Sequence, residues 1–265
     1  MKITFLGAGV FGSALAKIAE ENGHEVRFYD PYKYQNISLQ DATNGSDLNI
    51  FTAPSSAAKD ILPNLDKETP LICASKGFLS LNPFSDFKSF SALGGAGFAS
   101  DIKATEKVTF TTSSETAETI FSTENTHLEF TKDTLGIMLC GALKNIFAIG
   151  AGLYGETDSP AAPMSYLESA ITEMQTILKA NQADPETLRL SCGAADLVLS
   201  CTEKSRNFRF GRALKNHTPL PEENATVEGL LVINSLESYP DFIIPESASL
   251  FKDIIKTIKE QHVTQ

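Results

Sequence analysis

The sequence contains few of the residues that usually build a metal centre or a disulfide framework. Its 265 residues include four cysteines, four histidines and no tryptophan. No CxxC pair and no zinc-type spacing to a histidine is found for the cysteines, Cys73, Cys140, Cys192 and Cys201. We therefore expect no metal ion, and reduced, buried thiols of the kind found in cytoplasmic proteins.

Basic residues are outnumbered. The chain has 22 lysines and arginines against 33 aspartates and glutamates, which gives a net charge of -11 at pH 7. A nucleic-acid-binding protein needs a basic face to neutralise phosphates, so we expect no nucleic-acid partner. Local clusters of basic residues can still bind a small anion.

Only one apolar run is long enough to cross a bilayer. It covers residues 135–154 and carries Lys144 and Asn145 at its centre, where a membrane disfavours them. We expect a buried core helix and no membrane insertion. The N-terminal "MKITFLGAGVFG" has one basic residue, and glycines interrupt its apolar run, which predicts a first strand rather than a signal peptide.

What the sequence does contain is an alternation of short β-type runs with helical ones, followed by long helical patterns. The alternation predicts a mostly parallel, doubly wound sheet with strands at 2–6, 25–30, 48–53, 70–75, 90–95, 107–112 and 127–131. Helices are predicted at 133–154, 162–180, 185–200, 225–236 and 246–261. We therefore expect an α/β domain over residues 1–131 and an all-helical domain over residues 132–265, with a cleft between them.

The stretch "GAGVFG" places Gly7, Gly9 and Gly12 in a G-x-G-x-x-G pattern after a strand and at the start of a helix. In that context the glycines permit a tight turn, the approach of a diphosphate and close packing of helix on strand. The helix N-terminus then attracts the diphosphate. The pattern predicts a dinucleotide site that includes Val10 and Phe11.

Asp30 ends the second predicted strand, where an acid can bind the adenosine ribose hydroxyls, which favours NAD over NADP. The alternative is that Asp30, which precedes a proline, starts a turn. Two further strands run into "APSS" (53–56) and "ASKG" (74–77) at the edge where open α/β sheets bind ligands. Lys76 can therefore direct a positive charge into the cleft, although a solvated loop lysine is the alternative.

Lys144 and Asp196 each interrupt an apolar helical pattern. An acid in one apolar helix and a lysine in another predict a paired, partly buried site, with a structural ion pair as the alternative. Ser205, Arg206 and Asn207 form a compact set suited to an anion such as phosphate. The four histidines lie in polar or terminal contexts, so lysine is the better candidate for acid/base chemistry.

Together these motifs resemble the NAD(P)-dependent glycerol-3-phosphate dehydrogenases of the bacterial soluble type. The resemblance rests on "GAGVFGSALA" (7–16), "APSS", "ASKG", "LCGALKNIFAIGAG" (139–152), "DLVLSCTEKSRNFRFG" (196–211) and "VEG" (227–229). It implies a Rossmann-type domain followed by a helical one, and reversible hydride transfer between NAD(P)H and dihydroxyacetone phosphate or sn-glycerol 3-phosphate. It also implies a homodimer that supplies glycerol 3-phosphate for phospholipid synthesis.

The same resemblance implies roles for individual residues. Lys144 matches the catalytic lysine, Asp196 its acidic partner, and Lys76 a lysine that reaches the reacting end of the substrate. The remaining implied contacts are with the substrate or the cofactor. Substrate contacts are implied for Asn145, Ser205, Arg206 and Asn207, and cofactor contacts for Pro54, Ala99, Arg206 and Glu228.

The chain also departs from the family pattern. It is shorter, notably between Asp30 and Leu48, and Ala96 and Gly97 replace residues that usually supply a polar side chain to the substrate. After the lysine helix, residues 155–169 add acidic side chains in place of a Gly-rich loop, and Ala195 replaces the usual glycine before the acid. Two alternatives therefore stay open: a related lysine-dependent dehydrogenase for another small phosphorylated hydroxy or keto compound, and a non-catalytic dinucleotide-binding protein.

Overall fold

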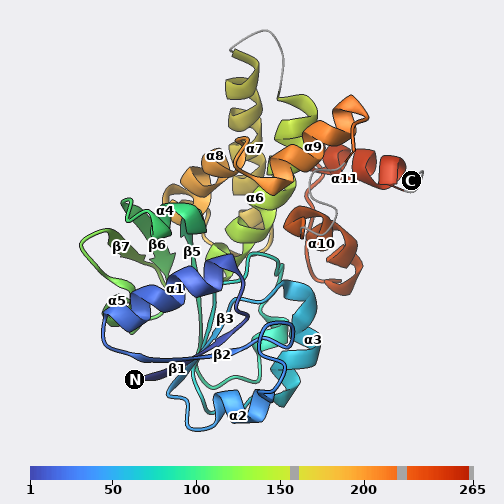
Figure 1. Ribbon diagram of the computed structural model, residues 1–265. Coiled ribbons are helices and arrows are strands. Elements are labelled where there is room, and N and C mark those ends of the chain that lie inside the picture. The colour runs from blue at the N-terminus through green and yellow to red at the C-terminus, as the bar shows by residue number, and fades with distance from the viewer. Residues whose placement is uncertain (156–160, 220–225, 263–265) are drawn as a thin grey trace.

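A seven-stranded sheet forms the N-terminal half of the protein, seen here in a computed structural model that describes residues 1–155, 161–219 and 226–262 (Figure 1). The strand order is β2-β1-β3-β4-β5-β6-β7. All neighbouring strands pair in parallel except β5 and β6, which confirms the predicted mostly parallel sheet. The seven predicted strands all form, as β1 (Lys2–Leu6), β2 (Glu25–Tyr29), β3 (Leu48–Phe51), β4 (Leu71–Cys73), β5 (Phe90–Ala96), β6 (Val108–Thr112) and β7 (Thr126–Phe130).

Both faces of the sheet are covered. Alternate residues of each strand point to opposite sides, so neighbouring residues of one strand belong to two different cores. Phe5 and Ile50 belong to the core under α1 and α5, whereas Leu6 and Phe51 belong to the core shared with the helical half. Short helices connect the strands. They are α1 (Val10–Glu21), α2 (Leu39–Thr43), α3 (Ala58–Ile61), α4 (Ala99–Lys103) and α5 (Ala117–Phe121).

After Phe130 the residues that the structure describes form helices and no further strand, which confirms the helical second half. The elements are α6 (Thr134–Tyr154), α7 (Ala161–Ala180), α8 (Asp196–Ser200), α9 (Arg206–Asn216), α10 (Glu228–Ser235) and α11 (Ser249–His262). Helix α6 runs through the middle of this half (Figure 1). It approaches α9 so closely that a Cβ atom on Gly152 would lie 2.6 Å from the backbone nitrogen of Arg212. The exact boundary between the two halves, expected after residue 131, stays a prediction.

Helix α6 is a core helix. Its length and mean hydropathy would suit a membrane span, but 94% of the apolar window is buried inside the protein. Asp133 caps its N-terminus by accepting a hydrogen bond from the Gly136 amide at 3.0 Å. The burial confirms the predicted core position of this apolar run. The cysteines are free, as expected, but Cys201 is only half-buried.

One helix prediction is wrong and one helix was missed. The predicted continuous helix at 185–200 is a 3₁₀ turn (Pro185–Arg189), a kinked segment (Ser191–Ala195) and α8. Gly193 has non-helical φ and ψ of -94° and -114°, and a Cβ atom there would overlap the Leu188 backbone. Helix α9 was not predicted, because the segment was interpreted from its basic residues as an anion-binding site and the helical spacing of its apolar residues was overlooked.

Candidate active site

The Gly-rich turn has the shape that its sequence predicts. Gly7 has a φ of 116°, and a Cβ atom there would lie 2.6 Å from the Ala53 nitrogen. A Cβ atom on Gly12 would lie 2.5 Å from the Gly7 carbonyl oxygen, so this glycine permits close packing of α1 on the turn. No atom lies within 4 Å of a Cβ built on Gly9, and α1 begins at Val10 with no acidic side chain in its first turn. The turn therefore offers open space and helix amides to a diphosphate.

Asp30 lies beside this turn, as predicted, but most of its hydrogen-bonding capacity is used. Its carboxylate accepts hydrogen bonds from the amides of Ala8 at 2.9 Å, Tyr32 at 3.0 Å and Lys33 at 3.1 Å. A carboxylate has about four acceptor positions, so roughly one remains for a ribose hydroxyl. The Lys33 ammonium donates to the Ala8 carbonyl and places a positive charge next to the same turn. Asp30 therefore does start a turn, and it can also bind a ribose.

Lys144, Asp196 and Lys76 meet in one charged cluster, although they lie far apart in the sequence. One Asp196 oxygen accepts from the Lys144 ammonium at 2.7 Å, and the other accepts from the Lys76 ammonium at 2.7 Å. Asp196 is 2% exposed, and the Lys144 side chain is 8% exposed. Lys144 also donates to the Ser200 hydroxyl at 2.7 Å, and Lys76 donates to the Gly95 carbonyl at 3.1 Å. The predicted pairing of Lys144 with Asp196 is confirmed.

Sequence reasoning missed Ser200 and its bond to Lys144. The signal was present, because Ser200 follows Asp196 by four residues, which puts both side chains on the same face of α8. Phe11 is a second link between motifs. Its ring centroid lies 5.5 Å from the Lys76 ammonium, so the Gly-rich turn and the charged cluster are neighbours.

Burial changes the acid strength of the catalytic candidate. The pKa of Lys144 falls from 10.5 to about 8, because removal from water and the nearby Lys76 ammonium lower it more than the Asp196 carboxylate raises it. An amine of this pKa can give and take a proton in the range where most enzymes work. The cluster thus combines a proton donor with a second ammonium that stabilises negative charge.

Asn145 and Asn207 link the segments around this cluster. The Asn145 amide donates to the carbonyls of Lys76 at 2.9 Å and Gly141 at 3.1 Å, and its oxygen accepts from Asn207 at 2.9 Å. The Asn207 oxygen in turn accepts from the Gly229 amide at 2.9 Å. Asn145 has used both of its donors, so these contacts give it a positional role. Direct contact of either asparagine with a substrate stays a prediction.

The predicted anion-binding residues lie at the start of α9. Ser205 is the buried N-cap residue, and Arg206 is the exposed first residue of the helix. Glu228 begins α10, and its Oε2 atom is buried without a hydrogen bond to any residue that the structure describes. Burial raises the pKa of Glu228, and the charge of Arg206 lowers it. A buried acceptor or acid without a partner fits a site that a polar ligand group completes.

Other predicted cofactor contacts lie at the ligand-binding edge of the sheet. Pro54 follows β3 and precedes a 3₁₀ turn, and Ala99 is the first residue of α4, which packs against α1. A Cβ atom on Gly77 would lie 3.4 Å from Glu228 Oε2, so the loop after β4 also faces that orphaned oxygen. Contact of these residues with a cofactor stays a prediction.

The departures from the family pattern are only partly visible. Ala96 ends β5, and a Cβ atom on the next residue, Gly97, would lie 3.2 Å from a Val108 methyl carbon. Glu156 and Asp158 of the acidic segment lie outside the described residues. Glu168 is exposed on α7, whose first turns project away from the sheet (Figure 1).

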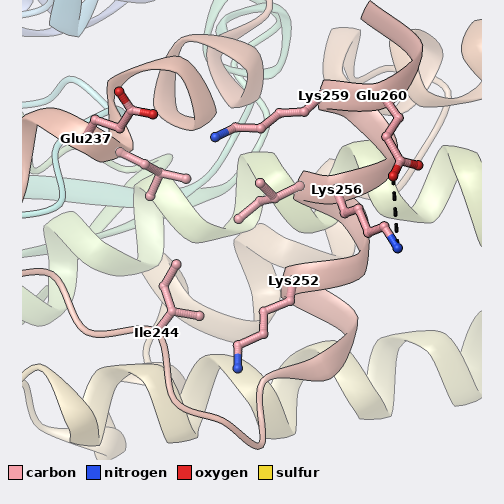
Figure 2. A pocket seen from close by; sticks show the side chains of 8 residues that line it. Glu237, Ile244, Lys252, Lys256, Lys259 and Glu260 are labelled. Carbon is pink, nitrogen blue, oxygen red and sulfur yellow. Dashed lines mark ion pairs between the residues drawn. The ribbon is translucent and has the colours of Figure 1, made fainter.

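A separate hollow of about 530 Å³ lies beside α11 (Figure 2). Its walls combine apolar side chains with lysines and glutamates, and Lys256 pairs with Glu260 at 4.0 Å. None of the residues of the charged cluster or the Gly-rich turn lines it. The chemistry of the sequence motifs therefore belongs to the sheet edge and not to this hollow.

Comparison with known proteins agrees with this geometry. Family models for the C-terminal and N-terminal parts of NAD-dependent glycerol-3-phosphate dehydrogenase match residues 133–262 and 2–37. Glycerol-3-phosphate dehydrogenase (NAD(P)+) of Colwellia psychrerythraea is 30% identical over 80% of this chain and 78% of its own. The same-named protein of Oceanobacillus iheyensis is 28% identical over 90% of this chain and 84% of its own.

A solved structure gives the same result for the fold. Glycerol-3-phosphate dehydrogenase from Coxiella burnetii superimposes with a TM-score of 0.80 at 21% identity, and the match covers 98% of both chains. The expected Rossmann-type domain with a helical domain is confirmed. The matches to both family models and to relatives that cover most of the sequence show that this chain is a member of the NAD-dependent glycerol-3-phosphate dehydrogenase family.

Proposed function

We propose that this protein catalyses reversible hydride transfer between NAD(P)H and dihydroxyacetone phosphate or sn-glycerol 3-phosphate. The observation that carries the proposal is the buried Lys144 ammonium. It has a pKa of about 8, bonds to Asp196, and lies in the same site as a Gly-rich turn shaped for a diphosphate. The activity named for the related proteins supports the same reaction.

In this mechanism the nicotinamide cofactor supplies the hydride, and the protein handles the proton and the charge. Lys144 donates its proton to the carbonyl oxygen as negative charge builds there, and in the reverse direction its neutral amine takes the hydroxyl proton. Lys76 stabilises the same oxygen. Asp196 holds both ammonium groups in place through its two 2.7 Å bonds. Ser200 fixes the orientation of the Lys144 amine.

The phosphate of the substrate binds at the start of α9. Arg206 is exposed there and supplies a planar set of donors, while Ser205 and the helix amides add further hydrogen bonds. Binding at the non-reacting end would position the carbonyl beside Lys144. Glu228 would complete the cofactor side, where its unpaired oxygen could accept a hydrogen bond from the bound dinucleotide.

We further propose a cytoplasmic homodimer that supplies glycerol 3-phosphate for phospholipid synthesis. The free cysteines support this location. Sedimentation of the purified protein tests the dimer, because a monomer would have a mass near 28.6 kDa.

The direct test is turnover by the purified protein. Mixed with NADH or NADPH and dihydroxyacetone phosphate, it should oxidise the cofactor, and the loss of absorbance measures the rate. The altered positions Ala96 and Gly97 favour a second candidate, a dehydrogenase for another small phosphorylated ketone. Turnover of such a ketone without turnover of dihydroxyacetone phosphate would favour that candidate. Cofactor binding without any turnover would instead indicate a non-catalytic dinucleotide-binding protein.

A further inference from the structure

A second polar network lies one helical turn before Asp196, on the segment Ser191–Ala195. Three strands of the sheet contact this segment side by side, since Gly94, Thr111 and Glu129 are direct register partners on β5, β6 and β7. A Cβ atom on Gly94 would lie 3.2 Å from the Cys192 Cβ, which shows how closely the segment approaches the sheet.

The contacts to this segment go to the backbone amides of Ser191 and Cys192 and to the Ser191 hydroxyl. Glu129 accepts hydrogen bonds from the Ser191 amide at 2.8 Å and from the Thr111 hydroxyl at 3.2 Å. The Thr111 oxygen accepts from the Cys192 amide at 3.1 Å and lies 3.0 Å from the Ser191 hydroxyl, which can donate to it. Thr111 is fully buried. Every donor of the network has an acceptor, which gives the start of the segment one defined position.

The other end of the segment leads directly into the charged cluster. Cys192 and Asp196 are four residues apart, and the three residues between them connect the polar network to the charged cluster. Gly193, one of these three, has non-helical φ and ψ, so the chain kinks there. A shift of Ser191 would therefore also move the Asp196 carboxylate. Both ion pairs of this carboxylate are short, at 2.7 Å, so a small displacement would lengthen at least one of them.

We infer that Thr111 and Glu129 are positioning residues for the proposed reaction, which act through the kinked segment Ser191–Ala195 to hold Asp196 between Lys76 and Lys144. Neither residue touches the charged cluster itself. The inference rests on the proposed function for its kinetic consequence, but the position of Asp196 can be measured without turnover.

The measurable consequence is the proton affinity of Lys144. The charged groups that act on its ammonium are Asp196, which favours the charged form, and Lys76, which opposes it. The nearby Cys201 thiol is neutral, because burial raises its pKa to about 12. If Asp196 moves away, the stabilising carboxylate is weakened and the Lys144 pKa falls below about 8. Thr111→Val changes no charge and keeps the branched shape, so a fall in this variant reports the displaced carboxylate.

The experiment follows the Lys144 side-chain nitrogen by NMR in protein labelled with ¹⁵N-lysine, with Lys144→Met used for assignment. In Thr111→Val and Glu129→Gln we expect the Lys144 pKa to fall by about one unit and kcat to fall about tenfold, with an unchanged KM for the cofactor. Thr111→Ser keeps the hydroxyl and should restore both values. Glu124→Gln, an exposed acid just before β7, is the charge-matched control.

The two failures are distinguishable. Variants that melt at a lower temperature but keep the wild-type Lys144 pKa and kcat would overturn the inference and leave the network a merely structural one. If the wild-type protein turns over no substrate, the proposed function fails, while the NMR titration still decides whether Thr111 and Glu129 set the position of Asp196.

Discussion

The Gly-rich turn and the charged cluster are built in different ways. The turn comes from one continuous stretch and presents backbone groups, so its sequence requirement is confined to its glycines. The cluster comes from three distant segments and presents side chains, because Lys76, Lys144 and Asp196 meet only in the folded protein. A substitution in the turn should therefore act through shape and on the cofactor, whereas one in the cluster should act through charge and on the chemical step.

The largest expected effect is the loss of the proton donor. Lys144→Met removes the ammonium that bonds to Asp196 and Ser200, and we expect kcat to fall by about 10³- to 10⁴-fold. The dissociation constant for NADH should stay the same, since the turn is untouched. Stopped-flow rates and fluorescence titration measure the two quantities. Lys179→Met, an exposed lysine on α7, is the control, and equal activity of both variants would remove Lys144 from the chemistry.

The next effect concerns the phosphate end of the substrate. Arg206→Ala should raise KM for dihydroxyacetone phosphate by about 10- to 100-fold, because a charge-assisted contact to phosphate is lost. Turnover of an unphosphorylated ketone should change little. Steady-state kinetics with both ketones separates these results, and Arg189→Ala, which removes an exposed guanidinium paired with Glu186, is the control. An unchanged KM would mean that Arg206 is structural.

Substitutions in the Gly-rich turn should affect cofactor binding or stability rather than the chemical step. Gly9→Ala places a methyl group where no protein atom lies within 4 Å, so folding should be unaffected while the dissociation constant for NADH rises about tenfold. Gly7→Ala should instead cost about 1–3 kcal/mol of unfolding free energy, because φ is 116° and the Ala53 nitrogen lies 2.6 Å from the new atom. Chemical denaturation and cofactor titration compare the pair. Tight NADH binding by Gly9→Ala would contradict a diphosphate at this position.

The pH dependence sharpens the role of the cluster. Ketone reduction needs protonated Lys144, so its kcat should fall about tenfold per pH unit above a pKa of about 8, while alcohol oxidation should rise with pH and level off above the same value. Asp196→Asn removes the charge that raises the Lys144 pKa, so the midpoint should move to lower pH. Rates measured from pH 6 to 10 in both directions check the signs. If the midpoint pH of the rate profile is the same in Asp196→Asn as in the wild-type protein, Lys144 is excluded as the titrating group.

The smallest expected effect is at the adenosine end. Asp30 favours a ribose hydroxyl, so NADH should be preferred to NADPH, but only a few-fold, because about one acceptor position remains and Lys33 supplies a nearby positive charge. Lys33→Met should lower kcat/KM for NADPH about threefold and leave NADH unchanged. Equal use of both cofactors by the wild-type protein would contradict the predicted preference.

The sequence predicts the seven strands and the turn well, because both depend on local patterns. The pairing of Lys144 with Asp196 could also be expected, since each interrupts an apolar helix. The kink at Gly193 could not, because it depends on Gly193 packing against the Leu188 backbone and on contacts of its segment with three strands. The bonds that occupy Asn145 depend in the same way on segments brought together only by folding. Tertiary contacts of this kind leave no periodic signal in the chain.

The kinked segment Ser191–Ala195 has one more consequence, which concerns chain length rather than side chains. Four residues, 192–195, separate the sheet contact at Ser191 from the carboxylate at Asp196, and the chain kinks at Gly193 between them. Each residue of an α-helix rotates the chain by about 100° and advances it by about 1.5 Å. Deleting one residue between these two points would therefore turn Asp196 away from both ammonium groups or pull Ser191 off the sheet. The number of residues between Ser191 and Asp196 sets the positions of both, so this segment should accept substitutions more readily than insertions or deletions.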